Sequence, residues 1–568
     1  MVSTAAKRQA GTDIPAYEAP FLEALEPALV DLAQHGIKVV TNAGASDAEA
    51  LTKAVERMIE KAGLSISVAR VSGDEVLPTI KSHLATGQHE YYDIYTDEPL
   101  STWSRQHEPI FAQAYLGGQG IARALAEGAQ IVICGRVSDA SPVIGAAVWW
   151  HHWSLQSYDM LANALIAGHL IECSTYVTGG NFSGFREIEK YGWEDLGFPI
   201  AEIARDGEVV ITKQKWSGGC VTVDTCTSQL LYEIQGPYYL NSDVTAYITN
   251  IWFEQLSTNR VAMRGVQGRP PPPTTKVGIT ALAGYQAEAW WFLTGLHVSD
   301  KARMLEAQLR RNLAPYSANF TTLRFSTIGR PAPDADNQDA ATAMFRIFAQ
   351  ARTASALTPK KFLRPIMDNI MQGYPGATFH LDFRQGLPKP FYEYFVTLLP
   401  QTAIDHRTHI RGRQITIPPP ENTMLTDSNT DHPQPLQTPP PSTTAQPFGP
   451  TLPLPLGTII HARSGDKSHT CNCGFWTPNP SSYPWLLTVL TTPLIRSLLG
   501  PNTPPTLKIS RFELPNLRAV HFLFEGLLGR GVTATSGLDF LGKNCAEFLR
   551  ARVVDVPVRF LPEEKGRL

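Results

Sequence analysis

The spacing of hydrophobic positions in the first third of the chain alternates between two patterns. Residues 37–41 form an apolar run that predicts a strand, and the segment from Asp47 to about residue 61 has the pattern of a helix capped by Asp47. The same two elements return at residues 118–127, which predict a helix, and at residues 130–134, which predict a buried strand. Helices and strands that alternate in this way predict a parallel sheet covered by helices.

Beyond Gly179 the pattern changes to alternating polar and apolar residues with polar turns, which predicts antiparallel or mixed strands. The strands are expected at residues 208–213, 220–227, 245–256, 377–383 and 391–398, and helices at residues 299–313 and 339–351. The simplest division places all of these elements in one large α/β domain that spans residues 1–401.

A proline-rich segment separates this domain from a smaller one. Residues 418–455 contain twelve prolines among many Ser, Thr, Asn and Gln residues, so the segment cannot bury enough apolar surface to offset its ordering entropy. We therefore expect a linker at residues 402–456 and a second domain at residues 457–560. The strands of the second domain are expected at residues 457–463, 506–513, 518–525 and 551–556, and its helices at residues 483–499 and 538–549.

The order strand, helix, strand, strand, helix, strand is that of a ferredoxin-like domain. The predicted fold class is therefore α/β: a large mixed α/β domain whose N-terminal part contains a parallel sheet, followed by a small ferredoxin-like α+β domain.

Composition narrows the range of partners. The 568 residues carry a formal net charge of -3, with 43% hydrophobic and 18% charged residues, so a nucleic acid is not expected as a ligand. The seven cysteines are odd in number and scattered, which favours a reducing, cytoplasmic setting over a disulfide framework. The longest apolar segment, residues 483–499, is interrupted by Pro and Arg and predicts a surface helix, so no membrane association is expected.

Two charged residues follow the buried strand at residues 130–134. Ligands of parallel α/β sheets bind beyond the carboxyl ends of the strands, where Arg136 and Asp139 are expected. Arg136 is suited to hold a carboxylate, and Asp139 is suited to accept a proton. The alternative is an ion pair that only holds the turn.

A second candidate group lies on a predicted helix. His169 and Glu172 are three residues apart, with Cys173 next to them, so they share one face and suit proton transfer. A buried histidine with a structural role is the alternative. No fourth ligand stands at a known zinc spacing, so no metal is predicted.

Glycine turns provide candidate binding sites for an oxyanion or a thioester carbonyl, because glycine allows the backbone to approach a ligand closely. Tight turns that join strands are the alternative. The residues concerned are Gly179, Gly180 and Asn181 in the first turn, and Lys213, Ser217, Gly218 and Gly219 at the second.

In the small domain, a strand runs into a charged segment that is expected to form a turn. Such a turn suits a phosphate or carboxylate, and a solvated connecting turn is the alternative. The residues are Arg463, Ser464, Gly465, Asp466 and Lys467. No dinucleotide fingerprint or P-loop occurs, so no cofactor is predicted, and CoA is considered only as part of the substrate.

Several segments together resemble the acyclic terpene utilisation (AtuA-like) family. In the large domain they include VVTNAG, AYLGG, ICGRVSDAS, AGHLIEC, TGGNFSG, ITKQKWSGGCVTVDT and GRPPPPTTKV, and in the small domain ARSGDK, FELPNLRAVHF and GKNCAEFL. The chain departs from the family pattern at His521, where an asparagine is typical. It also lacks the strand and helix with which family members usually begin, so we expect an N-terminally shortened large domain.

The resemblance implies a role in acyclic isoprenoid or related acyl metabolism. The leading hypothesis is an enzyme that acts on a carboxylic acid or CoA thioester by acid-base chemistry, of hydratase, lyase or isomerase type, with Asp139, His169 and Glu172 as proton-transfer residues. The alternatives are a non-catalytic binding or scaffold subunit associated with acyl-CoA carboxylation, and an inactive shortened paralogue. The expected partner is a small acyl or acyl-CoA molecule. Assembly into a homo-oligomer is left as an open alternative.

Overall fold

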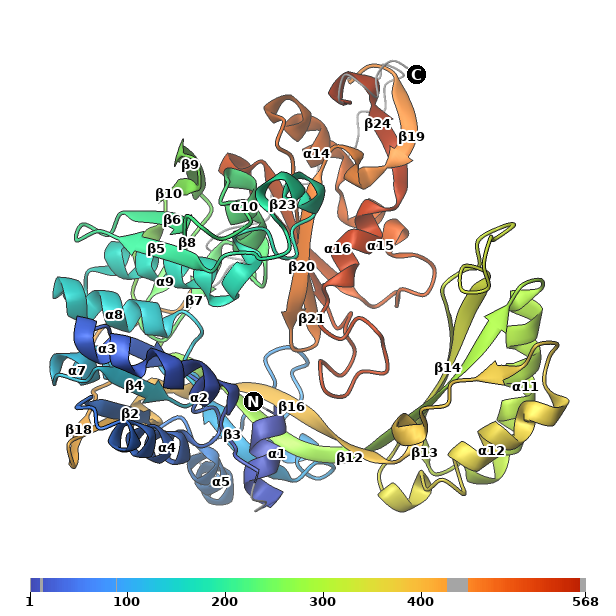
Figure 1. The fold of residues 1–568 in the computed structure, drawn as a ribbon, viewed down its shortest axis with the longest axis horizontal. Coiled ribbons are helices and arrows are strands. Elements are labelled where there is room, and N and C mark those ends of the chain that lie inside the picture. The colour runs from blue at the N-terminus through green and yellow to red at the C-terminus, as the bar shows by residue number, and fades with distance from the viewer. Residues whose placement is uncertain (1, 11–13, 88, 427–447, 562–568) are drawn as a thin grey trace.

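The structure, a computed structural model, describes residues 2–10, 14–87, 89–426 and 448–561. It consists of a large domain, a small domain packed against it, and an arm that projects from the large domain (Figure 1). Both helices and strands occur throughout, and the α/β fold class is confirmed.

The first sheet is parallel at its centre, as predicted. Its strands, in order, are β1 (Val39–Thr41), β4 (Ile131–Cys134), β2 (Val68–Ser72), β17 (Arg407–Ile410) and β18 (Arg413–Thr416). The first three are parallel, and the last two join antiparallel. The helices around this sheet are α1 (Val2–Ala10), α2 (Pro20–Leu25), α3 (Leu29–His35), α4 (Ala48–Lys61), α5 (Leu77–Thr86), α6 (Leu100–Trp103) and α7 (Gln119–Ala126).

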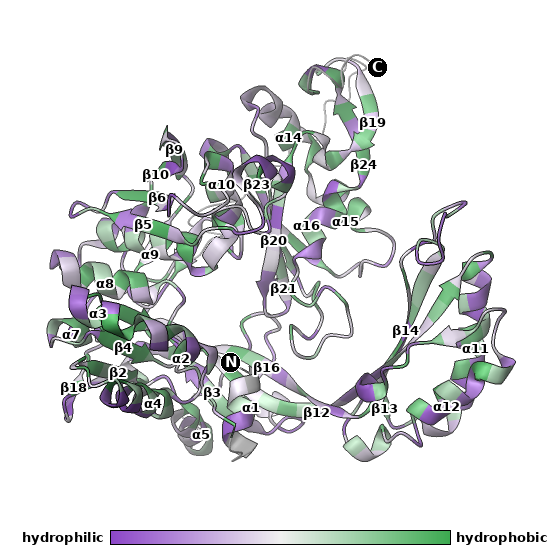
Figure 2. Cartoon of the chain, viewed as in Figure 1, coloured by the Kyte–Doolittle hydropathy of each residue, from purple (hydrophilic) through white to green (hydrophobic). Residues whose placement is uncertain are grey.

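Helices cover both faces of β4, which consists of hydrophobic residues (Figure 2). Ile131 and Ile133 pack on the side of α4, whereas Val132 and Cys134 pack on the side of α7. The predicted cap of α4 is also present, because the carboxylate of Asp47 accepts a hydrogen bond from the backbone N–H of Ala50 at 3.0 Å.

A single long strand, β12 (Thr274–Thr294), connects the body to the arm. Its first half pairs with β16 (Lys389–Pro400) and β3 (Pro109–Ala114). Its second half forms the arm together with β13 (Phe320–Ile328), β14 (Thr342–Ala351), β15 (Thr378–Phe379), α11 (Val298–Ser317) and α12 (Leu363–Met367). The helices α11 and α12 bury one face of this sheet in a core of their own.

The remaining part of the large domain surrounds two long helices, α8 (Ser141–His151) and α9 (Tyr158–Glu172). One sheet has the order β5 (Pro199–Ile203), β6 (Val209–Lys213), β10 (Arg260–Arg264) and β9 (Trp252–Ser257). A second has the order β11 (Gln267–Arg269), β8 (Thr245–Tyr247) and β7 (Tyr238–Leu240). Helix α9 is buried along most of its length between them.

Two predicted elements of the large domain are wrong. Residues 220–227 do not form a strand but lead into helix α10 (Val223–Leu231), which Thr222 caps together with Thr225. Residues 339–351 do not form a helix but the strand β14, which is paired on both sides. Seven consecutive buried residues end β14, and a continuous apolar run does not separate a buried strand from a buried helix.

The small domain contains a four-stranded antiparallel sheet. Its strands, in order, are β20 (His461–Lys467), β21 (Thr470–Trp476), β23 (Ala519–Glu525) and β22 (Lys508–Leu514). Its helices are α14 (Tyr483–Val489), α15 (Thr492–Leu499) and α16 (Asn544–Arg550). The final strand β24 (Val553–Pro557) pairs with β19 (Thr451–Pro455), outside this sheet.

Three details of the small domain differ from the prediction. Residues 463–467 belong to β20 rather than to a turn, and the turn falls at Ser468, whose φ is 60°. The strand β21 was not predicted. The expected helix at residues 483–499 is two helices, because the Thr491 hydroxyl caps α15 by accepting a hydrogen bond from the Leu494 N–H.

The two domains share a hydrophobic core. Trp476 and Leu514 of the small domain pack in the same buried cluster as Leu165 of α9 and Leu230 of α10. The range predicted as a linker contains β17, β18 and β19, and its central residues 427–447 lie outside the described residues. Among the described residues, no helix combines the length and the apolar composition that crossing a membrane requires.

Candidate active site

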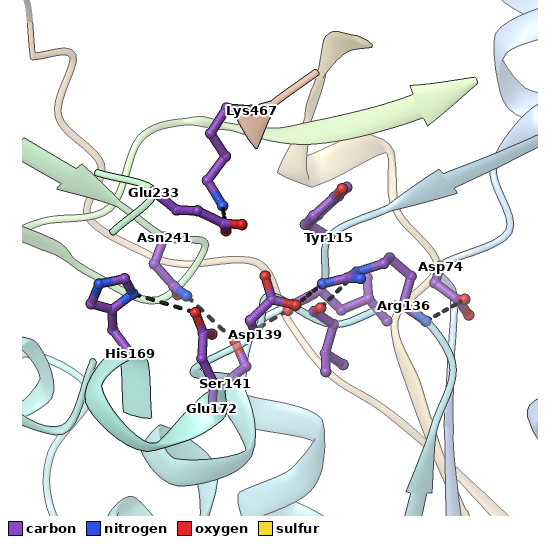
Figure 3. A network of polar contacts seen from close by, with 12 residues as sticks. Asp74, Tyr115, Arg136, Asp139, Ser141, His169, Glu172, Glu233, Asn241 and Lys467 are labelled. Carbon is purple, nitrogen blue, oxygen red and sulfur yellow. Dashed lines mark hydrogen bonds and ion pairs between the residues drawn. The ribbon is translucent and has the colours of Figure 1, made fainter. Parts of the chain in front are cut away.

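A cavity of about 430 Å³ lies where the small domain meets the large one. The large domain contributes Arg136 and Asp139 from the end of β4, Tyr115 and Lys276 from the neighbouring sheet, and Glu233 after α10. The small domain contributes Asp466 and Lys467 from the end of β20. The two domains therefore build one polar cavity together, and Figure 3 shows its central residues.

Arg136 and Asp139 lie beyond the carboxyl end of β4, as the sequence predicts. Their side chains form an ion pair, and 38% of the Asp139 side chain is exposed to the cavity. The backbone N–H of Arg136 donates to the buried carboxyl group of Asp74 at 2.8 Å. A side chain at Gly135 would come within 2.4 Å of the same carboxyl group, so the turn requires glycine. The ion pair considered as an alternative is present, and it also lines the cavity.

Tyr115 lies between two cations. The guanidinium of Arg136 and the ammonium of Lys276 each lie 4.4 Å from the centre of its ring, and its hydroxyl is 3.3 Å from that of Tyr394. Burial alone would raise the pKa of Tyr115, but Lys276 and Arg136 outweigh burial and hold the pKa below its ordinary value of 10. Such a phenol gives up a proton, or stabilises a developing negative charge, more readily than an ordinary tyrosine.

Lys467 reaches across the domain boundary to Glu233, and the two form an ion pair. Burial alone would lower the pKa of Lys467, but Glu233 and other nearby acids raise it, so the side chain stays an ammonium. Glu233 has a left-handed backbone with φ of 61°, and its N–H donates to the side chain of Asn472 at 3.0 Å. Asn472 of the small domain therefore helps to hold this conformation.

Glu172 and His169 lie behind the cavity at the end of α9 (Figure 3). His169 is fully buried, with Nε2 3.2 Å from the carbonyl oxygen of Leu230 and Nδ1 3.4 Å from Glu172. One carboxylate oxygen of Glu172 is buried and has no hydrogen-bond partner among the described residues, and burial raises the pKa of the group. Glu172 therefore gives up its proton less readily than an ordinary glutamate, and its other carboxylate oxygen lies beside His169.

Asp466 makes the stability of the fold depend on pH. Burial, together with the charge of Glu233, raises its pKa from 3.8 to about 6. Its contribution to the unfolding free energy is therefore complete below about pH 4 and is lost as the pH rises through about 6.

We expect Asp466→Asn to be more stable than the native protein above pH 6 by about 1–2 kcal/mol, and no more stable near pH 4. Urea unfolding across this range measures the difference. A constant difference at all pH values would contradict the assignment.

Lys276 is the cation that makes the cavity suited to an anion. Within the described part of the chain it has no carboxylate partner, whereas Arg136 and Lys467 are both paired. Its ammonium group faces the ring of Tyr115 in the cavity. A carboxylate or a polarised carbonyl oxygen would therefore find an unpaired cation and a phenol side by side.

The predicted glycine turns lie outside this cavity. The N–H groups of Gly179, Gly180, Gly218 and Gly219 all donate to carbonyl oxygens of neighbouring turns. The ammonium of Lys213 is likewise bound to the carbonyl oxygens of Gln214 and Ser217. These groups make structural contacts in the structure, and their binding role stays a prediction.

Two residues of the predicted small-domain site, Arg463 and Gly465, serve the domain contact. Arg463 is buried between the rings of Tyr176 and Tyr232 and donates to the carbonyl oxygen of Asn181 at 2.8 Å. A side chain at Gly465 would come within 2.3 Å of the Tyr232 ring. Ser464 makes its contact within the small domain, where it accepts a hydrogen bond from the N–H of Ala546 in α16. Of the five predicted residues, Asp466 and Lys467 line the cavity.

Sequence reasoning missed Tyr115, Lys276 and Glu233 as site residues. Tyr115 and Lys276 lie in the motifs AYLGG and GRPPPPTTKV, which carry the family resemblance, so those motifs held a usable signal. Glu233 lies in QLLYEI, a further segment that resembles the family, but its role depends on a lysine from another domain. No group of three or more metal-binding side chains occurs among the residues that the structure describes.

Comparison with known families gives two matches. The model of the acyclic terpene utilisation family protein AtuA matches residues 1–410, and the model of the AtuA ferredoxin-like domain matches residues 454–555. The chain matches no curated protein and no solved structure.

Proposed function

The chain belongs to the acyclic terpene utilisation family AtuA, and on this premise we propose that it is an enzyme that acts on an acyclic isoprenoid carboxylic acid or its CoA thioester by acid-base chemistry. The proposed reaction is of hydratase, lyase or isomerase type. These three types share one step, the removal or addition of a proton at a carbon activated by a carbonyl group.

The arrangement around Tyr115 carries this proposal. A carbonyl oxygen placed beside Tyr115 and Lys276 would receive a hydrogen bond from the phenol and the field of an unpaired ammonium. Both interactions strengthen when the oxygen gains negative charge as an enolate forms, so they favour the transition state over the bound substrate.

Asp139 is the proposed base. Desolvation alone would raise its pKa, but Arg136 and Lys467 hold it below the ordinary value, so the group is ionised and able to accept a proton. The proton leaves the carbon next to the carbonyl group, and its bonding electrons move to the carbonyl oxygen beside Tyr115. Glu172 behind the cavity, whose pKa is raised by burial, is the proposed proton donor for the reverse direction or for a later step.

The proposal is tested with purified protein, an acyclic monoterpenoid acid and its CoA thioester, without a redox cofactor. We expect conversion of at least one of them, and Asp139→Asn should lower kcat about a hundredfold. Asp195→Asn, which removes an exposed carboxylate outside the cavity, is the matched control and should leave kcat unchanged. Native turnover that Asp139→Asn does not alter would remove Asp139 from the mechanism.

A further inference from the structure

Strand β12 carries a glycine on the face that it turns toward the candidate active site. Val277, Ile279 and Ala281 point into the core, so the residues between them face the opposite side of the sheet. Lys276 belongs to that side and reaches the cavity, and Gly278 is the next residue on it. The backbone of Gly278 is not left-handed, so its conformation does not require glycine. A glycine inside a strand often marks the close approach of another group.

The group that approaches Gly278 is the side chain of Tyr394. Tyr394 belongs to β16, where its backbone is paired with Thr280 of β12. A Cβ atom at position 278 would come within 1.7 Å of the hydroxyl oxygen of Tyr394 and within 2.1 Å of its Cζ. Both distances are far shorter than a van der Waals contact, so any residue other than glycine would displace the ring of Tyr394.

Tyr115 lies on the other side of the same strand. Its N–H donates to the carbonyl oxygen of Lys276 at 2.9 Å, where it follows β3, and β3 and β16 pair with opposite edges of β12 (Figure 1). The hydroxyl of Tyr394 reaches over Gly278 and lies 3.3 Å from the hydroxyl of Tyr115. Gly278 therefore leaves the space in which phenols from two different strands meet.

The surroundings of the two phenols give their hydrogen bond a direction. Burial raises the pKa of Tyr394 well above its ordinary value of 10, and the neighbouring Tyr115 adds to this effect, so Tyr394 keeps its proton. Burial also acts on Tyr115, but Lys276 and Arg136 outweigh it and hold the pKa of Tyr115 below 10. Tyr394 is therefore the donor, and the oxygen of Tyr115 is the acceptor.

We propose that Tyr394 is a positioning residue that donates a hydrogen bond to the phenol oxygen of Tyr115, and that Gly278 provides the space for this contact. The contact joins Tyr394, Tyr115 and the substrate carbonyl oxygen in one chain of hydrogen bonds, in which each bond strengthens the next. Negative charge that reaches Tyr115 as the enolate forms is then shared with Tyr394. The effect on turnover rests on the proposed function, whereas the contact between the phenols does not.

Several other titratable groups face Tyr115 and are left unchanged when the Tyr394 hydroxyl is removed. A shift in the ionisation of Tyr115 therefore reports on that hydroxyl. The groups are Arg136, Asp139 and Lys276 next to Tyr115, and Tyr95, Glu233, Asp466 and Lys467 in the rest of the cavity.

Ultraviolet difference absorption, which follows the ionisation of tyrosines, tests the proposal on the full chain. The native protein should contain a phenol that ionises below pH 10, and Tyr115→Phe should lose this transition, which assigns it to Tyr115. In Tyr394→Phe the transition should move up by about one pH unit, because a hydrogen bond to a charged oxygen is lost. Gly278→Ala should move it as far, and Gly278→Ala combined with Tyr394→Phe should move it no further.

Tyr392→Phe is the matched control, since Tyr392 lies on the same strand but outside the cavity, and it should leave the transition in place. A transition that stays at the native pH in Tyr394→Phe would overturn the proposal. The absence of any transition below pH 10 that depends on Tyr115 would overturn it equally, as would a folded Gly278→Ala variant with an unshifted transition.

Kinetics provides the second readout. If the native protein converts a thioester, Tyr394→Phe should lower kcat about tenfold and leave KM within about twofold. An unchanged kcat in this variant would remove Tyr394 from the mechanism. A native protein that converts no thioester would contradict the proposed function, and the titration would still decide whether Tyr394 acts on Tyr115.

Discussion

Replacing Tyr115 with phenylalanine is expected to lower kcat/KM by a factor of about 10²–10⁴. The substitution removes the hydroxyl that would bind the developing oxyanion but keeps the ring on which Arg136 and Lys276 pack. KM should change little, because the interaction strengthens only in the transition state. Steady-state kinetics on the substrate that the native protein converts measures the effect.

Tyr95 provides the matched control for this experiment. It lines the same cavity, but neither Arg136 nor Lys276 lies against its ring, and its hydroxyl accepts a hydrogen bond from the exposed side chain of Gln235. Tyr95→Phe should therefore retain kcat within about threefold of the native value. An equal loss in both variants would mean that the phenol of Tyr115 has no special role.

Replacing Lys467 with methionine is expected to lower the unfolding free energy by about 2–3 kcal/mol. The carboxylate of Glu233 would then stay in the domain contact without its cation, and only about a fifth of either side chain is exposed. Chemical denaturation followed by tryptophan fluorescence measures the loss, and the buried Trp476 reports on the contact.

Two further variants distinguish the loss of the ion pair from a non-specific loss of stability. Lys467→Met combined with Glu233→Gln should be more stable than Lys467→Met alone, because no unpaired charge is left. Lys508→Met, which breaks an exposed ion pair with Glu525 in the same sheet, should cost less than about 1 kcal/mol. A double variant that is less stable than both Lys467→Met and Glu233→Gln would show that the ion pair is not what stabilises the contact.

The parts of the structure that the sequence predicts well are those fixed by local rules. Asp47 caps α4, and the apolar run of β4 forms a central strand with helices on both faces. Arg136 and Asp139 then had to lie at the carboxyl end of that strand, where parallel sheets bind ligands. Asp139, three positions after that arginine, lines the cavity with it, so a simple positional rule located these two residues of the site.

The parts that the sequence does not predict depend on contacts between distant segments. The sequence of β14 predicts a helix because both faces of the strand are buried and no period-two pattern is left. It forms a strand because it pairs with β12 and β13. Lys467 reaches Glu233 only because Trp476 packs into the core of the large domain. The pKa of Tyr115 is lowered because Lys276, 161 positions away in sequence, lies on its ring together with Arg136.

Exchange of the substrate proton next to the carbonyl group tests the central claim most directly. The native protein is incubated in D₂O with the CoA thioester of an acyclic monoterpenoid acid, and mass spectrometry follows deuterium at the carbon next to the carbonyl group. The account predicts deuterium uptake by the native protein and by Tyr95→Phe, and its loss in Tyr115→Phe and Asp139→Asn. Conversion of the thioester by the native protein without uptake, or uptake that survives both substitutions, would contradict it.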